Sequence, residues 1–242
     1  MTQHKPDIIF QDEHLLVASK PPGLLSIPDR FAPEKPNLMA QLNAVFGKVW
    51  VVHRLDRETS GLLCWALTEE AHKSLSLQFQ NRETEKHYLA LVDGRPASES
   101  GEIRQAIGEH PTIKGKMCVI KSGKPALTYY QVIQYFRQFS LIDAKIETGR
   151  THQIRVHLES IGHPLAVDPL YGQRSAFFLS EIKQKGYQLG KFQEEKALME
   201  RLSLHAWKLK LKHPATEEEM SFEAPLPKDF RAVLNQLEKW GR

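Results

Sequence analysis

The segment His53–Gly61, with the sequence HRLDRETSG, is a polar insert between two short apolar runs of the chain. Loops at strand ends often carry functional residues, because a rigid scaffold positions them without burying them. A carboxylate in such a loop, here Asp56, can act as a nucleophile or as a proton acceptor. By composition alone, however, the favoured interpretation of the segment is a charged turn closed by Thr-Ser-Gly.

Other chemistries lack their usual sequence marks. The chain contains no GxGxxG, GxxxxGK[ST], HExxH or GxSxG motif, which argues against dinucleotide-binding, P-loop, zincin and α/β-hydrolase classes. His152, His157 and His163 invite a metal site, but their spacing places them on no common helical face. We therefore expect ordinary helix-surface and loop histidines, no metal, and chemistry that needs no cofactor.

Four ordered motifs change the interpretation of the polar insert. His53–Gly61 resembles the catalytic motif of the RluA family of RNA pseudouridine synthases, which is HRLD followed two residues later by TSG. Three other stretches resemble the KPxG, K-x-Y-x-A-x-V-x-G and TGRxHQ[IL]R[VA]H motifs of that family, in the same order: Lys20–Leu25, Lys86–Gly94 and Thr148–His157. The resemblance continues through Gly162–Leu165, Asp168–Gly172 and Leu204–Ala206, and covers about residues 8–227.

The resemblance implies a catalytic role for three residues. Asp56 matches the motif aspartate that reacts with the sugar or the base of a uridine. Arg155 matches the arginine that pairs with this carboxylate and holds it ionised through a fork of hydrogen bonds. Tyr88 matches the tyrosine that stacks on the target base, and its phenol could take part in the late proton transfer from C5.

The same resemblance implies a set of RNA contacts. A base inside folded RNA must leave its stack to reach Asp56, and Arg54 matches the arginine that occupies the vacated space. Basic residues between Arg104 and Lys124 form either a phosphate-contacting arm or a solvated hairpin. The remaining candidates for RNA contact are His53, Thr59, Lys20, Arg150 and His152. For His53 and Thr59 a second role is considered, which is to shape the loop.

Charge and composition are compatible with an RNA partner. The formal net charge is +4 and the isoelectric point is about 8.9. We expect 23S-type ribosomal RNA, transfer RNA or both as substrate, no membrane association, and a cytoplasmic monomer without an S4 RNA-binding domain. Two distant cysteines, Cys64 and Cys118, exclude a disulfide scaffold.

Two other function classes remain as alternatives. An RNA-binding or RNA-folding protein could use the same surface without turnover, although it would not need the combination of Asp56, Tyr88 and Arg155. A glycosidase or nucleosidase could also use an aspartate, but the motifs supply no evident second carboxylate in an acid role.

The elements that must position these residues are mainly strands. A hairpin is expected from Ile8–Phe10 and Leu15–Ala18. Helices are expected over 37–46 and 68–80, with Asn37 and Thr68 as their caps, and over 151–161, where Arg155 falls at the edge of the apolar stripe. A closing helix is expected after Pro227, with an apolar stripe formed by Phe230, Val233, Leu234 and Leu237. Further strands are expected over 49–52, 61–68, 86–92, 126–136, 141–147, 207–212 and 220–224. This irregular order favours an α+β fold with a mixed, mainly antiparallel sheet. The resemblance implies the pseudouridine synthase fold: one catalytic domain over 1–242, with two sheet halves, a central cleft and a helical insertion at 173–203.

Overall fold

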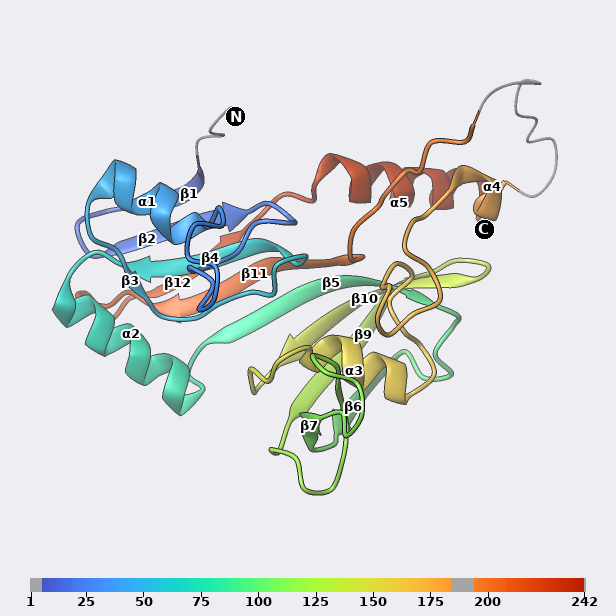
Figure 1. Ribbon diagram of the computed structural model, residues 1–242, viewed down its shortest axis with the longest axis horizontal. Coiled ribbons are helices and arrows are strands. Elements are labelled where there is room, and N and C mark those ends of the chain that lie inside the picture. Colours follow the sequence, from blue (N-terminus) through green and yellow to red (C-terminus); the bar gives the residue numbers. More distant parts are fainter. Residues whose placement is uncertain (1–5, 184–193, 242) are drawn as a thin grey trace. The chain divides into compact units, whose positions relative to one another are not determined.

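The computed structural model describes residues 6–183 and 194–241. Residue contacts divide the chain into two units, Met1–His87 with His205–Pro225 and Tyr88–Leu204 with Leu226–Arg242. Figure 1 shows that both units consist largely of strands, with a few helices packed beside them. The predicted α+β class is confirmed, and each unit is described in turn below.

The first unit contains a mixed sheet. Its strands follow the order β1 (Asp7–Gln11), β2 (Leu15–Lys20), β4 (Ser60–Ala66) and β11 (Leu204–Lys212). Strand β3 (Trp50–Val51) pairs with β4, and β12 (Glu219–Glu223) pairs with β11. The pair of β4 and β11 is parallel, whereas β2 is antiparallel to both β1 and β4. The polar insert therefore lies between two strands of one sheet, as the sequence predicts.

Two capped helices complete the first unit. Helix α1 (Leu38–Phe46) begins where the Asn37 side chain accepts a hydrogen bond from the backbone of Ala40. Helix α2 (Glu69–Asn81) begins in the same way at Thr68, which accepts from Ala71. Both caps were predicted. One face of α2 packs on the sheet in a core that includes Leu15, Val17, Leu62, Cys64, Ala71, Leu75, Leu209 and Phe222.

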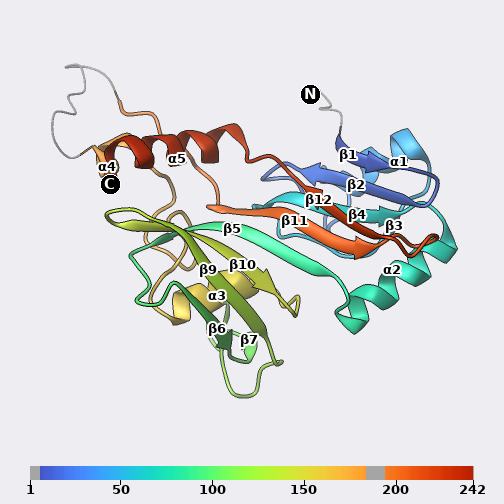
Figure 2. The ribbon, with the colours of Figure 1, turned by 180° about the vertical axis from the view of Figure 1, so that it is seen from behind.

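The second unit has its own run of strands. They follow the order β5 (Glu85–Asp93), β10 (Phe139–Ile146), β9 (Leu127–Tyr135) and β6 (Ser100–Arg104), and β9 is antiparallel to both β10 and β6. Figure 2 shows these strands from behind. Helix α5 (Lys228–Trp240) buries Phe230, Val233 and Leu237, which belong to the apolar stripe that the sequence predicts.

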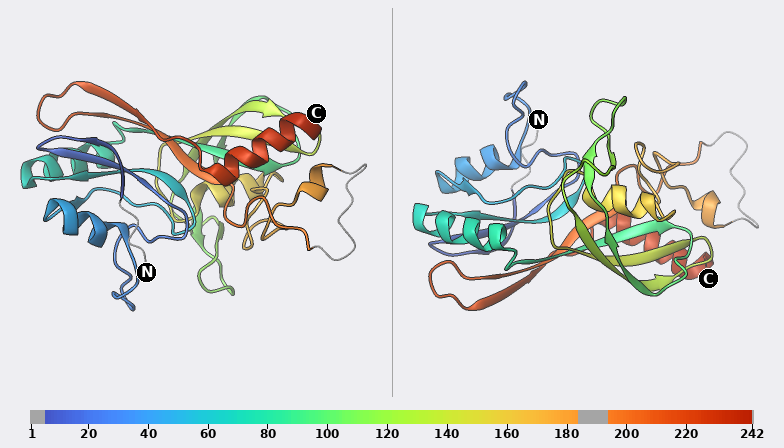
Figure 3. Two further views of the ribbon diagram at one scale, coloured as in Figure 1. Left: turned by 90° about the horizontal axis from the view of Figure 1, so that it is seen from above. Right: turned by 90° about the horizontal axis from the view of Figure 1, so that it is seen from below.

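The basic segment between Arg104 and Lys124 forms a small hairpin. Strands β7 (Ile107–Glu109) and β8 (Met117–Val119) pair with each other, and β8 packs beside helix α3 (Gln153–Ser160). Figure 3 shows this green segment extending from the second unit in both views. The sequence predicts a basic, loop-rich excursion here, and the segment forms a hairpin. Its contact with phosphates stays a prediction.

The predicted insertion at 173–203 is only partly helical where it can be described. Helix α4 (Leu179–Ile182) is the one helix in its described part, and a bridge joins Phe177 to Met199. Residues 184–193 lie outside the described residues. Across residues 6–183 and 194–241, no helix combines the length and apolar character needed to cross a membrane.

Candidate active site

Asp56 lies in an irregular loop between β3 and β4 whose backbone is held by its neighbours. The Ser26 hydroxyl donates to the carbonyl of Leu55 at 2.8 Å and accepts from its N–H at 3.1 Å. The N–H of Thr59 donates to the carbonyl of Asp56 at 3.1 Å. Leu55 is buried while Asp56 is half-buried. The carboxylate therefore stands on a fixed backbone and is partly exposed.

Lys20 is a buried residue that is hydrogen-bonded to this loop. Its side chain is fully buried, and its ammonium donates to the carbonyls of Pro21, Leu24 and Arg57 at 2.8–3.0 Å. Arg57 and Gly23 exchange two further hydrogen bonds, each 2.9 Å long. The prediction that Lys20 contacts RNA phosphates is wrong, because a buried ammonium committed to three carbonyls cannot reach a phosphate. Its position instead ties the KPPG segment to the HRLD loop.

The other predicted RNA contacts of this loop differ in accessibility. Arg54 is exposed two residues before Asp56, so it can reach a nucleic acid. Thr59 is only 2% exposed. Thr59 therefore shapes the loop, which is the second of the two roles considered for it.

His53 is a neutral residue that also supports the loop. Its Nε2 accepts the backbone N–H of Cys64 at 3.1 Å, and its ring stacks on Phe79 with centroids 4.5 Å apart. Burial, with a smaller contribution from the charge of Lys86, lowers the pKa of His53 from 6.5 to about 3. An uncharged ring with an occupied Nε2 fits a structural role and not a phosphate contact.

The Thr-Ser-Gly end of the loop is fixed by β11. A side chain at Gly61 would place its Cβ 2.1 Å from the carbonyl oxygen of Ala206, and the φ of Gly61 is +115°. Only glycine allows the two parallel strands to approach this closely. Beside it, the hydroxyl of buried Ser60 lies 2.9 Å from Nδ1 of His205, which is itself fully buried.

In the second unit, Arg155 projects from α3 into a buried ion pair. Its Nε and Nη2 donate to the two oxygens of Asp168 at 2.7 and 2.8 Å. Arg155 is 6% exposed and Asp168 is 0% exposed. The sequence predicts Arg155 at the edge of the apolar stripe, and it does not predict Asp168 as its partner. The one available signal was the Asp168–Gly172 motif, to which no role had been assigned.

A tight turn aims Asp168 at Arg155. Besides the arginine, Oδ1 of Asp168 accepts the N–H groups of Leu170 and Tyr171 at 2.9 and 3.1 Å. The N–H of Gly172 donates a hydrogen bond to the carbonyl of Asp168 at 2.9 Å, which closes the turn. A carboxylate with these partners has one orientation, and a bidentate pair transfers that orientation to the guanidinium.

Helix α3 is anchored by residues of the same motif. The Gln153 side chain accepts from the Thr148 hydroxyl at 2.7 Å and donates to Leu127 and Thr128 at 3.0 Å each. His157 is fully buried between Thr128 Oγ1 and the carbonyl of Gln105, at 2.9 and 3.0 Å. Burial lowers its pKa. These contacts fix α3 to β9 and thereby fix the base of Arg155.

The remaining predicted residues of the second unit lie on its strands and at the start of α3. Tyr88, in β5, is 7% exposed. Arg150 is half-buried and its Nε donates to the carbonyl of Pro125 at 3.1 Å. His152 adopts a left-handed conformation with φ 56°, and its Nδ1 lies 2.8 Å from the hydroxyl of Tyr171. The roles of these residues toward RNA stay predictions.

The histidines considered as metal ligands have other partners. His157 uses both ring nitrogens as described above, and Nδ1 of His163 hydrogen-bonds the carbonyl of Asp93 at 2.9 Å. Within the described part of the chain, no group of three histidine, cysteine or acidic side chains is arranged to hold a metal ion.

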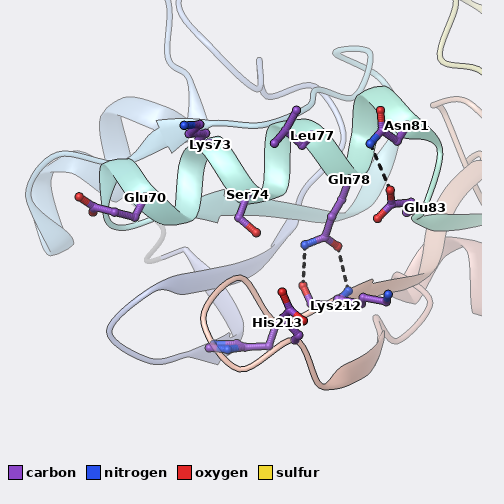
Figure 4. A pocket seen from close by; sticks show the side chains of 10 residues that line it. Glu70, Lys73, Ser74, Leu77, Gln78, Asn81, Glu83, Lys212 and His213 are labelled. Atoms are coloured by element: carbon purple, nitrogen blue, oxygen red, sulfur yellow. Dashed lines mark hydrogen bonds between the residues drawn. The ribbon is translucent and has the colours of Figure 1, made fainter.

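An open groove of about 510 Å³ lies on the first unit, away from these residues. In Figure 4, the Gln78 amide donates to the carbonyl of Lys212 and accepts its N–H, both at 2.9 Å. A side chain of α2 is thereby hydrogen-bonded to the backbone at the end of β11. Both acidic and basic side chains line the groove, and neither charge dominates. The lining residues, which include none of the predicted site residues, are Glu70, Lys73, Ser74, Leu77, Gln78, Asn81, Glu83, Lys212, His213 and Glu217.

Comparison with known proteins gives concordant matches. A family model described as RNA pseudouridylate synthase matches residues 14–160, which include Asp56, Tyr88 and Arg155. Ribosomal large subunit pseudouridine synthase D of Nitrosomonas europaea is 40% identical over 95% of this chain, and the chain spans 64% of that protein's length. The protein of the same name from Pseudomonas aeruginosa is 40% identical over 96% of this chain, which spans 71% of it. The solved structure of human RNA pseudouridylate synthase domain containing 4 is 26% identical, with a TM-score of 0.74, over 96% of this chain and 93% of that one.

Proposed function

This chain belongs to the RNA pseudouridylate synthase family, and we propose that it converts specific uridines of large-subunit ribosomal RNA to pseudouridine with Asp56 as the reacting carboxylate. The names of the two bacterial relatives favour ribosomal RNA of the large subunit over transfer RNA. Family membership and the position of Asp56 on an anchored loop beside an exposed arginine support the proposal.

The reaction is an isomerisation that balances without a redox partner. The bond between ribose C1′ and N1 breaks, the freed uracil turns, and a new bond forms between C1′ and C5. N1 ends with a proton and C5 loses one. Asp56 attacks the sugar or the base, or accepts a proton from the sugar, and in each case the site must retain the base while it turns.

Arg155 is proposed to act on the same uridine as Asp56. Asp168 occupies the Nε and Nη2 edge of its guanidinium, and we assign the Nη1 group to the substrate. Because Arg155 is held at two points by a buried carboxylate, it does not lose conformational freedom when substrate binds. This is preorganised electrostatic support for a reaction in which charge moves between sugar and base.

Tyr88 and Arg54 are proposed to handle the base. The Tyr88 ring offers a stacking surface, and its phenol is suited to the removal of the C5 proton. Extruding a uridine from a helix costs about a few kcal/mol, and the exposed Arg54 can replace the lost stacking. Exposed lysines of the β7–β8 segment, such as Lys114 and Lys121, supply phosphate contacts.

The test is site-resolved mapping of pseudouridine in total RNA from cells that lack the gene. Complementation compares the unaltered chain, Asp56→Asn, and the matched control Asp7→Asn, which removes an exposed carboxylate from the same unit. We expect the unaltered chain and Asp7→Asn to restore modification at one or a few uridines, and Asp56→Asn to restore none while it binds RNA within a few fold.

The outcomes separate the possible functions. Modified uridines in transfer RNA alone would contradict the choice of ribosomal RNA. Activity retained in Asp56→Asn would contradict the role of Asp56. If the purified chain binds RNA and forms no pseudouridine on unmodified ribosomal or transfer RNA, the RNA-binding alternative is correct.

A further inference from the structure

We propose that Tyr171 is a positioning residue whose ring supports Arg155 and whose hydroxyl sets the orientation of His152 and the place of the β7–β8 hairpin. This inference rests on the proposed function, because it assigns Arg155, His152 and the hairpin to the handling of RNA. Tyr171 belongs to the Asp168–Gly172 motif, for which the sequence supplied no role.

The ring of Tyr171 is a platform for cations. The Cζ of Arg155 lies 4.7 Å from the ring centroid, and Nζ of Lys116, from the hairpin, lies 5.0 Å from it. Tyr171 is 5% exposed, so these contacts are shielded from water. Arg155 is thus held by a carboxylate at one edge and by an aromatic ring over its plane.

The hydroxyl of Tyr171 joins two segments that are far apart in the chain. It accepts the backbone N–H of Met117, in β8, at 2.8 Å. It also lies 2.8 Å from Nδ1 of His152, at the start of α3. The backbone N–H of Met117 can only donate, so the hydroxyl oxygen is the acceptor in that bond. The direction of the second bond is set by the tautomer of His152, because a phenol oxygen can accept two hydrogen bonds or accept one and donate its proton to Nδ1.

The chemistry of the phenol keeps this arrangement constant. Burial raises the pKa of Tyr171 to about 12, so the hydroxyl remains protonated throughout the physiological range. His152 also sits in a left-handed backbone conformation, with φ 56°, that an ordinary residue adopts only when its surroundings hold it there. One hydroxyl thus contacts both a residue with a left-handed backbone and a strand of the hairpin.

A phenylalanine would fill the core equally well, which makes the hydroxyl separable from the ring. Tyr171→Phe keeps the ring under Arg155 and removes both hydrogen bonds, whereas Tyr171→Leu removes the ring as well. The matched control is Tyr135→Phe in the same unit, where the hydroxyl donates to the carbonyl of Pro96 at 3.0 Å and Arg95 lies 4.8 Å from the ring.

Three measurements on the full chain report the two functions of Tyr171. For Tyr171→Phe we expect KM for RNA to rise about tenfold with kcat within about threefold of the unaltered enzyme, since a buried hydrogen-bond network is lost but Arg155 is kept. Exchange of the Met117 amide should accelerate by at least about tenfold. The nitrogen-15 shift of Nδ1 in His152 should change, because this atom loses its hydrogen-bond partner. Tyr171→Leu should in addition lower kcat by about tenfold or more.

The control variant separates the loss of the Tyr171 hydroxyl from the loss of any tyrosine hydroxyl in the same unit. Tyr135→Phe should leave KM, Met117 exchange and the His152 shifts unchanged. The inference is overturned if Tyr171→Phe matches this control in all three measurements. Exchange and nitrogen shifts require no turnover, so an unaltered chain that forms no pseudouridine would overturn the proposed function while these two measurements still decide which contacts the hydroxyl makes.

Discussion

Lys20→Met distinguishes a buried anchor from an RNA contact. The substitution keeps most of the apolar stem and removes the ammonium that joins Pro21, Leu24 and Arg57. A phosphate contact and a buried anchor respond to this change in opposite ways, because the first acts on RNA affinity and the second acts on folding.

The size of the effect follows from the acceptors left behind. The carbonyl of Arg57 keeps a hydrogen bond from Gly23. The carbonyls of Pro21 and Leu24 accept no other hydrogen bond in residues 6–183 and 194–241. A fully buried acceptor left without a partner costs about 1–3 kcal/mol, but Pro21 is exposed and Leu24 is half-buried, so water replaces part of what is lost. We therefore expect Lys20→Met to lower the free energy of unfolding by about 1–3 kcal/mol, which corresponds to a fall in Tm of roughly 2 °C or more for a chain of this size.

The assay combines thermal unfolding with the salt dependence of RNA binding. We expect Lys20→Met to lower Tm and kcat, because the Asp56 loop loses its anchor, and to leave the slope of log affinity against log salt unchanged. Lys114→Met, which alters an exposed lysine of the hairpin, should keep Tm and make that slope shallower by up to about one. An unchanged Tm together with a shallower slope for Lys20→Met would refute the argument and restore the phosphate contact.

Two further predictions follow from the first unit. Because the folded pKa of His53 is lowered to about 3, its contribution to stability is complete above the unfolded value near 6.5 and is lost as the pH falls from 6.5 toward 3. His53→Gln should therefore flatten the decline of unfolding free energy in that window, measured by urea titration at successive pH values, and a parallel decline would contradict the neutral state. Burial raises the pKa of the Cys64 thiol, whereas Cys118 is only half-buried. Mass spectrometry after brief alkylation should find label on Cys118 and none on Cys64 until the chain is denatured, and early labelling of Cys64 would contradict its burial.

The elements that the sequence predicted correctly depend on local physics. Asn37 and Thr68 cap helices through hydrogen bonds to backbone groups three residues away, so the pattern and the contact lie in the same short window. The stripe on α5 likewise depends only on the helical period. The strands β7 and β8 were not predicted individually, because strands of three residues carry too few side chains for an alternating pattern to be visible.

The incorrect or missing assignments depend on contacts between distant segments. Lys20 is the last residue of β2 and precedes two prolines, which is typical of a surface lysine. Its carbonyl partner at Arg57 is 37 residues away, and no local pattern reveals that three carbonyls converge on it. For Arg155, the sequence predicted the position of the residue but not its partner. The helical wheel placed it near the core, but choosing Asp168 among the 29 acidic residues required the fold.

The contacts also explain why motif residues without an assigned role occur in this chain. Within the first unit, the KPPG segment meets the HRLD loop through Lys20, and the TSG segment meets the LHA segment through Gly61 and Ala206. Within the second unit, the HQIR segment meets the DPLYG segment through Arg155 and Asp168. Each residue that is expected to react or to bind thus depends on a second motif that holds it. A motif residue with no evident chemistry is therefore best tested as the partner of one that has it, as Tyr171 is for Arg155.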